Sequence, residues 1–303
     1  MTPNRPAFID QHDLEQFWEN FYTKCQKNRG EHFFGTSYLE GLDAVMSYLA
    51  KNEKKEQFSL QELSKREVKG VMKLCKVKPG AKLLNLPCGK GRHDLYFLEQ
   101  GLKVYGGDIN LVALQEAKKN LDERSKKIVN SREEKPDFEP SLHYEQMDMR
   151  QIPYHDFFDI AVNLMYSIGY FFEEEENFEV LEQYAQALKP GGTLLIQTSV
   201  PLDLAAQQSY DEEQRTQLKD GKRLLIQKQF DPQKKRMNGI WSWFSKQGTL
   251  EQQSYYSTRI YAEQELIQEL QKAGFASVVC LGDREGNPRK PGDPNLILLA
   301  KKS

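Results

Sequence analysis

Short apolar runs alternate with segments of helical periodicity through the middle of the chain. A short apolar run is typical of a buried strand, whereas apolar residues spaced three and four positions apart are typical of a helix. The pattern predicts strands at 82–86, 103–108, 143–147, 158–164 and 193–198, with helices at 92–100, 111–127 and 173–188 between them. Strands that alternate with helices predict a mostly parallel sheet covered by helices on both faces.

Two segments depart from this alternation. Residues 10–50 carry aromatic residues at helical spacing and predict a helical cap, and the spacing of Ser59 and Glu62 predicts the start of a further helix. Residues 201–260 contain extended runs without a helical pattern between them, at 223–230, 236–244 and 251–260. These three runs predict a small antiparallel β insert on the α/β core.

The end of the chain predicts a helix and two strands. Residues 262–273 have helical spacing, and Gly274 suits the position after the last helical turn. The strands at 277–281 and 296–300 are joined without a helical crossover, so this pair should be antiparallel. We therefore expect an N-terminal helical cap at 1–78, a core at 79–200 and 258–303, and an inserted lid or dimerisation segment at 201–257.

Composition and charge narrow the class of protein. The chain has 303 residues, with 42 Lys and Arg against 44 Asp and Glu, so its net charge is −2. A near-neutral chain has no overall field that attracts nucleic acid or anionic lipid. No apolar run is long enough for a membrane span, no secretory signal follows the first residues, and the four cysteines lack metal-binding spacing. These features predict a cytoplasmic protein without a bound metal.

A turn that contains glycine follows the first predicted strand. The sequence from Asn85 to Asp94 reads NLPCGKGRHD, in which Gly89 and Gly91 allow a sharp turn and a close approach of the backbone to a ligand. The positive end of the following helix points to the same place. A carboxylate at Asp94 would repel the phosphates of a dinucleotide, which disfavours a nicotinamide cofactor and suits a ligand without phosphates.

Polar residues stand at or near the ends of the other predicted strands. Asp108 ends the second strand, where a carboxylate can accept hydrogen bonds from both hydroxyls of a ribose. Asp148 follows the third strand, where it could accept from an adenine amino group, and Asn163 lies near the end of the fourth. Ligands of open α/β sheets bind at the carboxyl ends of the strands, so these residues and Asn85 should converge on one crevice.

Together these motifs resemble class I S-adenosylmethionine-dependent methyltransferases, in particular the branch with a Cys-Gly-x-Gly-Arg-His loop that acts mostly on small molecules. The resemblance covers about 82–198 and 258–302, including Asp148-x-Arg150 and the Lys189-Pro190-Gly191-Gly192 turn. It implies a Rossmann-like methyltransferase sheet with an antiparallel last strand, S-adenosyl-L-methionine as cofactor and S-adenosyl-L-homocysteine as product. The cofactor contacts that it implies are Asn85, Pro87, Cys88, Gly89, Gly91, Asp108, Ile109, Asp148, Met149, Asn163 and Leu164.

Two positions depart from the family pattern. The first strand usually carries an acidic residue where Asn85 stands, and a further glycine often occupies the place of Pro87. Asn85 can still accept a hydrogen bond from the cofactor's amino group through its amide oxygen, but without charge attraction. Weaker cofactor binding, or a non-catalytic scaffold that binds S-adenosylmethionine, is the alternative that these departures raise.

Methyl transfer requires a nucleophile aligned with the methyl group and the exclusion of water. A general base is needed only if the acceptor arrives protonated. The catalytic candidates are His93, Tyr166 and Tyr170, although packing at a helix start is the simpler role for His93. The candidates for binding the acceptor are Tyr38, Ser167, Trp241, Trp243 and Arg259, although core packing is the simpler role for the tryptophans. Cys88 is expected to pack and not to act as a nucleophile.

We expect a methyltransferase that acts on a nitrogen or oxygen of a small molecule. Enzymes that methylate the amino groups of nucleic-acid bases often carry Asn-Pro-Pro-Tyr after the fourth strand, whereas residues 163–166 read Asn-Leu-Met-Tyr. Nucleic acid is therefore a disfavoured partner, and no membrane partner is expected. A protein acceptor stays an alternative, and the aromatic insert could equally form the interface of a homodimer.

Overall fold

The structure is a computed structural model that describes residue 41 and the ranges 59–130, 141–164, 167–198, 200–207, 211–218 and 220–303. The helices predicted within 10–50 and the loop predicted at 130–140 lie outside the described residues, apart from Gly41 and Asn130. No helix within the described ranges has the length and apolar character needed to cross a membrane.

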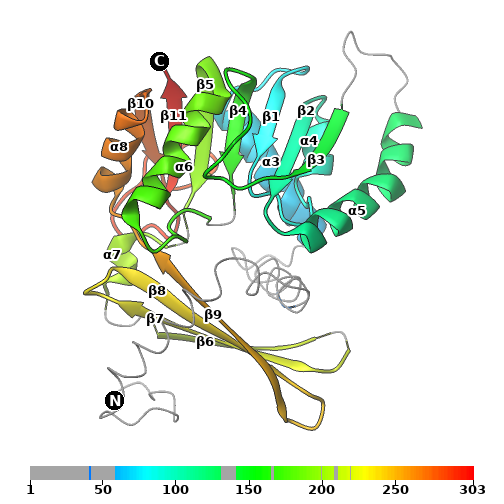
Figure 1. Ribbon diagram of the computed structural model, residues 1–303, viewed down its shortest axis with the longest axis vertical. Helices are drawn as coiled ribbons and strands as arrows, with labels where there is room; N and C mark the ends of the chain where they lie inside the picture. The colour runs from blue at the N-terminus through cyan, green and yellow to red at the C-terminus, as the bar shows by residue number, and fades with distance from the viewer. Residues whose placement is uncertain are drawn as a thin grey trace.

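A seven-stranded sheet forms the core (Figure 1), in the order β10-β11-β5-β4-β1-β2-β3. Its strands are β1 (Lys82–Asn85), β2 (Lys103–Asp108), β3 (Ser141–Gln146), β4 (Phe158–Asn163), β5 (Leu188–Gln197), β10 (Phe275–Leu281) and β11 (Ile297–Lys302). Strands β1 to β5 pair in parallel, whereas β11 runs antiparallel to both β5 and β10. The predicted Rossmann-like sheet, mostly parallel with an antiparallel last strand, is confirmed.

Helices cover both faces of this sheet (Figure 1). One face is covered by α3 (Leu60–Leu74), α4 (Asp94–Glu99) and α5 (Leu111–Asn130), and the other by α6 (Glu174–Ala187) and α8 (Glu263–Lys272). Successive strand residues face opposite layers, so Leu83 packs with α3 and α4 while Leu84 packs with α6 and α8. The predicted start of α3 is also confirmed, because Ser59 and Glu62 form a reciprocal capping box.

The insert is a second, antiparallel sheet that extends away from the core (Figure 1). It contains β6 (Asp211–Gln217), β7 (Arg223–Asp231), β8 (Arg236–Phe244) and β9 (Leu250–Arg259), and the short helix α7 (Leu202–Ala205) precedes it. The predicted antiparallel insert is confirmed, but it has four strands where three were expected. The strand that was missed, β6, reads DEEQRTQ and has no apolar alternation, so only its hydrogen bonds to β7 define it as a strand.

Candidate active site

The turn between β1 and α4 uses its two glycines for different purposes. Gly89 has a φ of +56°, and nothing lies within 4 Å of the position that a Cβ atom would take. Gly91 has a φ of +69°, and its Cβ position lies 2.1 Å from the hydroxyl oxygen of Tyr144 on β3. Only Gly89 therefore leaves open space beside the turn that a ligand could fill, whereas Gly91 makes room for a side chain of the core.

Substitution of the two glycines by alanine should separate these roles. Gly89→Ala places a methyl group in open space and should cost only about 1–2 kcal/mol of unfolding free energy, because of its left-handed backbone. Gly91→Ala adds a clash with Tyr144 and should cost roughly 2–4 kcal/mol. Urea denaturation would measure both. Tyr144→Phe should recover part of the loss in the Gly91→Ala background, and equal losses for the two single variants would contradict this assignment.

Asp108, at the end of β2, joins the glycine turn to the start of α5. Its Oδ2 accepts a hydrogen bond from the Gly89 backbone N–H at 2.8 Å, and its Oδ1 accepts from Asn110 N–H at 2.8 Å. Burial raises the pKa of the Asp108 carboxyl, while these backbone hydrogen bonds oppose the shift. Each carboxylate oxygen keeps further capacity to accept, so Asp108 fits the predicted contact with two ribose hydroxyls.

An exposed apolar patch adjoins Asp108, and sequence reasoning found only part of it. Ile109, Leu111 and Val112 are 38%, 53% and 37% exposed, although large apolar side chains are usually buried. All three lie beside the carboxyl end of β2. Ile109 was predicted as a cofactor contact, whereas Leu111 and Val112 resemble ordinary positions of an amphipathic helix in the sequence. The patch places exposed apolar side chains next to a hydrogen-bonding carboxylate.

The carboxylate of Asp148 is already bound by Arg150, two residues later in the same motif. Arg150 donates to both carboxylate oxygens, with the shortest contact at 2.6 Å from its Nη2, and it also bonds Glu176 at 2.6 Å. Burial raises the pKa of Asp148, but the hydrogen bonds and the charge of Arg150 outweigh it and lower the pKa overall. An adenine amino group would have to compete with Arg150 for this side chain. Met149 is half-buried against the core beside it.

Two buried amides stand at the carboxyl ends of β1 and β4. Asn85 donates from Nδ2 to Asp94 Oδ1 at 2.6 Å, and Asn163 donates from Nδ2 to the Tyr184 hydroxyl at 3.1 Å. The amide oxygens of both residues are buried and have no hydrogen-bond partner among the described residues. Leu164, predicted beside Asn163, is buried as well. A ligand that donates hydrogen bonds would satisfy such oxygens.

The position of Asp94 corrects one step of the sequence argument. Its side chain is fully buried and faces Asn85 beneath the turn, so it does not meet a ligand's phosphates directly. In the same turn, Cys88 is 7% exposed and Pro87 is half-buried. Burial raises the pKa of the Cys88 thiol well above its usual range, which leaves no reactive thiolate and agrees with packing.

His93 faces away from the crevice, which argues against its predicted role as a catalytic base. Its Nε2 lies 2.8 Å from the Glu67 carboxylate of α3, and its side chain is 5% exposed. Arg92 and Arg284 pair with the same carboxylate. Burial and the charge of Arg92 lower the pKa of His93 to about 4, against the opposing effect of Glu67. His93 is therefore neutral at physiological pH and serves to hold α3 to α4.

The insert is joined to the segment that follows β4 by two arginines paired across β8 and β9. Arg236 is buried and donates to the carbonyl oxygens of Gly169 at 3.3 Å and Phe171 at 3.2 Å. The Arg259 backbone N–H donates to Gly169 O at 2.7 Å. Its guanidinium pairs with Glu174 at 2.7 Å and Glu265 at 3.2 Å. The predicted acceptor-binding role of Arg259 therefore gives way to a structural one.

The remaining candidates for acceptor binding and catalysis have mixed positions. Trp241 and Trp243 are buried in the insert's own cluster with Leu224, and a Cβ on Gly41 would lie 2.9 Å from both Leu224 and Trp241. Ser167 is buried, and Tyr170 is half-buried, in the segment that Arg236 and Arg259 hold. Burial raises the pKa of Tyr170 to about 12. Tyr38 and Tyr166 lie outside the described residues.

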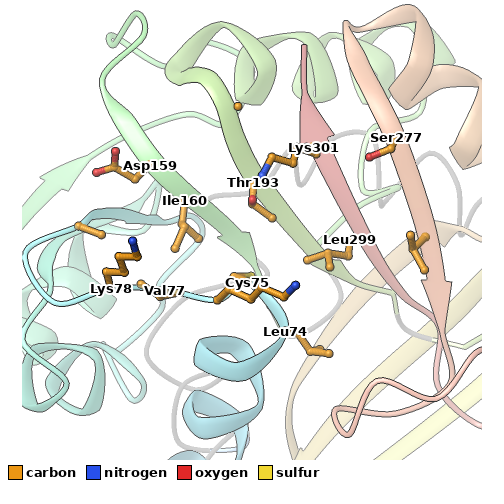
Figure 2. A pocket seen from close by; sticks show the side chains of 14 residues that line it. Leu74, Cys75, Val77, Lys78, Asp159, Ile160, Thr193, Ser277, Leu299 and Lys301 are labelled. Carbon is orange, nitrogen blue, oxygen red and sulfur yellow. The ribbon is translucent and has the colours of Figure 1, made fainter.

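A separate cavity of about 530 Å³ lies away from all of these residues (Figure 2). It is bounded by the segment after α3 and by β4, β5, β10 and β11, with Asp159, Thr193 and Lys301 among its walls. Asp159 is near the amino end of β4, whereas Asn85, Asp108 and Asn163 stand at carboxyl ends. Because parallel α/β sheets bind ligands at the carboxyl ends of their strands, we place the candidate site at that edge and not in this cavity.

Known proteins share the domain and the fold of this chain. Residues 84–196 match a family model described as a methyltransferase domain, while no curated protein matches the chain. An S-adenosylmethionine-dependent methyltransferase from Clostridium acetobutylicum has a similar structure, with a TM-score of 0.65 and 13% identity over 87% of this chain and 99% of that chain.

Two further solved structures share the fold. The CcbJ methyltransferase from Streptomyces caelestis has a TM-score of 0.63 and 14% identity over 79% of this chain and 89% of that chain. CalS10 with bound S-adenosylmethionine, an amino pentose methyltransferase from Micromonospora echinaspora, has a TM-score of 0.59 and 16% identity over 86% of this chain and 96% of that chain. At such identities these likenesses show the fold. The family match places a methyltransferase domain at residues 84–196, within this fold.

Proposed function

We propose that the enzyme transfers the methyl group of S-adenosylmethionine to a nitrogen or oxygen atom of a small molecule, beneath the β insert. The observation that carries this proposal is the junction of the insert with the segment after β4. Arg236 and Arg259 bind the carbonyl oxygen of Gly169 from the insert, so the insert borders the edge where β4 delivers Asn163. An acceptor at this edge would be enclosed between the two sheets, which favours the exclusion of water.

In this proposal the cofactor lies along the carboxyl ends of β1, β2 and β4. The open side of Gly89 would receive its methionine part, Asp108 its ribose hydroxyls, and the patch of Ile109, Leu111 and Val112 the face of its adenine. Asn163 and Leu164 would lie under the sulfonium. These assignments follow the donors, acceptors and apolar surface found at each strand end.

The proposed chemistry is an in-line displacement, in which the acceptor's lone pair forms a bond to the methyl carbon as the carbon–sulfur bond breaks. The described candidates favour alignment over proton removal, because His93 faces Glu67 and the phenol of Tyr170 stays protonated at neutral pH. A protonated Tyr170 could orient the acceptor as a hydrogen-bond donor. An amine that arrives neutral needs no base before it attacks, so amines suit this site better than alcohols.

Amino sugars are a reasonable first class of acceptor to test, because CalS10 is an amino pentose methyltransferase on the same fold. The enclosed position of the proposed acceptor also agrees with a small molecule. Protein and nucleic-acid acceptors, and a scaffold without turnover, are the outcomes that the experiment below must separate.

The first test is a calorimetric titration of the purified protein with S-adenosylmethionine and S-adenosylhomocysteine, with NAD as the control ligand. We expect micromolar dissociation constants for the first two and no binding of NAD. Methyl transfer from labelled S-adenosylmethionine to a panel of amino sugars, amines and phenols, beside a peptide and an RNA pool, would then identify the acceptor class. Cofactor binding without turnover on any small molecule, or turnover on peptide or RNA alone, would overturn the proposal.

A further inference from the structure

A buried carboxylate lies directly behind the amide at the end of β1. Asn85 and Asp94 are 1% and 0% exposed, and the Asn85 Nδ2 donates to Asp94 Oδ1 at 2.6 Å. Asp94 is in the first turn of α4, nine residues later in the chain, and no part of the methyl-transfer proposal uses it. Burying a carboxylate costs free energy, so a fully buried Asp94 beside the glycine turn needs a physical explanation.

The contact fixes which way the Asn85 amide points. An ionised carboxylate can only accept hydrogen bonds, so the amide must present its nitrogen to Asp94 and turn its oxygen elsewhere. That oxygen is buried and has no partner among the described residues. A buried amide oxygen without a donor loses the free energy of a hydrogen bond, which a bound N–H group would restore.

The charge next to this amide is negative. Three further groups face Asp94 or its surroundings from the packed elements: the Cys88 thiol in the turn, the Asp108 carboxylate on β2 and the Tyr144 hydroxyl on β3. The arginine and histidine that precede it, Arg92 and His93, are turned to Glu67. On α5, Glu116 pairs with Lys90 of the turn at 3.0 Å. The described groups thus leave a negative centre beneath the glycine turn, which suits a cationic donor.

We propose that Asp94 is a positioning residue for the cofactor. Asp94 holds the Asn85 amide so that the amide oxygen points toward the ammonium group of bound S-adenosylmethionine. Its carboxylate also supplies the negative charge that the ammonium group requires. The inference rests on the cofactor crevice of the proposed function. In this proposal the negative charge at the site comes from Asp94 in α4, because β1 ends in the neutral Asn85.

The arrangement makes cofactor affinity depend on the protonation of Asp94. Burial raises its pKa to about 7, against the opposing hydrogen bonds of Asn85 and Tyr144. When Asp94 is protonated it can donate to the Asn85 oxygen, and the amide would turn its NH₂ group toward the ligand's ammonium. Affinity should therefore fall as the pH drops below about 7, because the ionised form of Asp94 is the one that binds a cation.

The test compares two ligands that differ in the ammonium group. S-adenosylhomocysteine carries the group, whereas 5′-methylthioadenosine lacks the whole amino-acid part. Calorimetry of the wild-type protein should show affinity for S-adenosylhomocysteine about tenfold weaker at pH 6.0 than at pH 7.5, as one pH-linked proton predicts. The affinity for 5′-methylthioadenosine should be the same at both values.

Substitutions then separate the effect of the Asp94 charge from the effect of the shape of its side chain. Asp94→Asn should weaken S-adenosylhomocysteine about tenfold at pH 7.5, remove the dependence on pH and leave 5′-methylthioadenosine unchanged. The double variant Asn85→Asp with Asp94→Asn moves the carboxylate to β1 and should recover affinity to within about threefold of the wild type. A thermal melt checks that each variant is folded.

Unchanged binding in Asp94→Asn, or no recovery of affinity in the double variant, would overturn the proposal. The pH comparison uses the wild-type protein, so it tests the proposal even if Asp94→Asn is unstable. If the wild-type protein binds neither ligand, the cofactor crevice itself is wrong and this inference falls with it. If the wild type binds both ligands without the predicted pH dependence, the crevice stands and only the role of Asp94 fails.

Discussion

Asp108→Ala should weaken S-adenosylmethionine binding by at least about 100-fold. The substitution removes the acceptor proposed for two ribose hydroxyls, and a hydrogen bond to a charged group is worth roughly 1.5–3 kcal/mol, so two bonds correspond to about 100-fold or more. It also releases the Gly89 N–H, which Asp108 holds at 2.8 Å, so the glycine turn loses one of its constraints. Isothermal titration calorimetry measures the change directly.

Two further variants make this result interpretable. Asp108→Asn keeps the size of the side chain and one acceptor oxygen, and it should lose only about tenfold, consistent with one charged hydrogen bond. Asp156→Asn is the matched control. Asp156 has a φ of +45°, which asparagine tolerates, and its carboxylate pairs with Lys302, which is not part of the candidate site. It should bind like the wild type. Tight binding by Asp108→Ala in a folded protein would remove Asp108 from the site.

Glu67→Gln should lower the free energy of unfolding by about 3–5 kcal/mol, the usual cost of removing one partner from a buried ionic group. The Glu67 side chain is 6% exposed and binds Arg92, His93 and Arg284, which come from the glycine turn, the start of α4 and the connection after β10. Glutamine keeps one acceptor but leaves the two guanidinium charges without compensation. Urea denaturation at pH 7.5 measures the loss.

Acid should reduce the difference between Glu67→Gln and the wild type. Burial raises the pKa of Glu67, but the hydrogen bond from His93 and the charges of the arginines outweigh it and hold the pKa well below its usual range. The stability that this depressed pKa supplies is complete above the usual value near 4.5 and is lost as the pH falls through the folded value. Acid also destabilises the wild type through His93, since its pKa of about 4 makes its protonation oppose folding below pH 6.5.

Glu269→Gln is the control for Glu67→Gln. Glu269 pairs with Lys272 on the same helix at 2.6 Å, and that lysine is mostly exposed. Such a surface pair contributes well under 1 kcal/mol, so this variant should match the wild type within about 0.5 kcal/mol. A similar small loss for Glu67→Gln would mean that the cluster does not hold α3 to the turn.

The fold was largely predictable because its strands and helices carry their own periodicity. The parallel core and the antiparallel last pair follow from apolar runs and from a connection without a helix, both visible in the sequence. The strand β6 escaped because its residues are polar and its state depends on pairing with β7. Similarly, β5 begins at Leu188, before the Lys-Pro-Gly-Gly turn that predicts a break, because Leu188 pairs with Phe158 across a register shift.

The local geometry of the candidate site was predictable only where neighbouring residues determine the backbone. The sharp turn at Gly89 and the place of Asp108 at the end of β2 follow from the residues that turns at strand ends need, while their contacts with the cofactor stay predictions. The roles of His93 and Arg259 were not predictable, because their partners lie 26 and 85 positions away in Glu67 and Glu174. These ion pairs join residues that the fold brings together from distant parts of the chain. No spacing in the sequence indicates such pairs. The contact of Asn85 with Asp94 is likewise invisible without the turn that brings them together.

The polar character of β6 has a consequence for behaviour in concentrated solution. Among the described residues, β6 pairs with β7 on one side only, so its other edge could offer backbone donors and acceptors to a second chain. The run Asp-Glu-Glu-Gln-Arg-Thr-Gln disfavours a parallel, in-register pairing with a second copy, because that pairing would set the like charges of Asp-Glu-Glu directly opposite one another. The polar residues that concealed β6 from sequence analysis thus also disfavour the growth of the insert by this kind of edge-to-edge pairing.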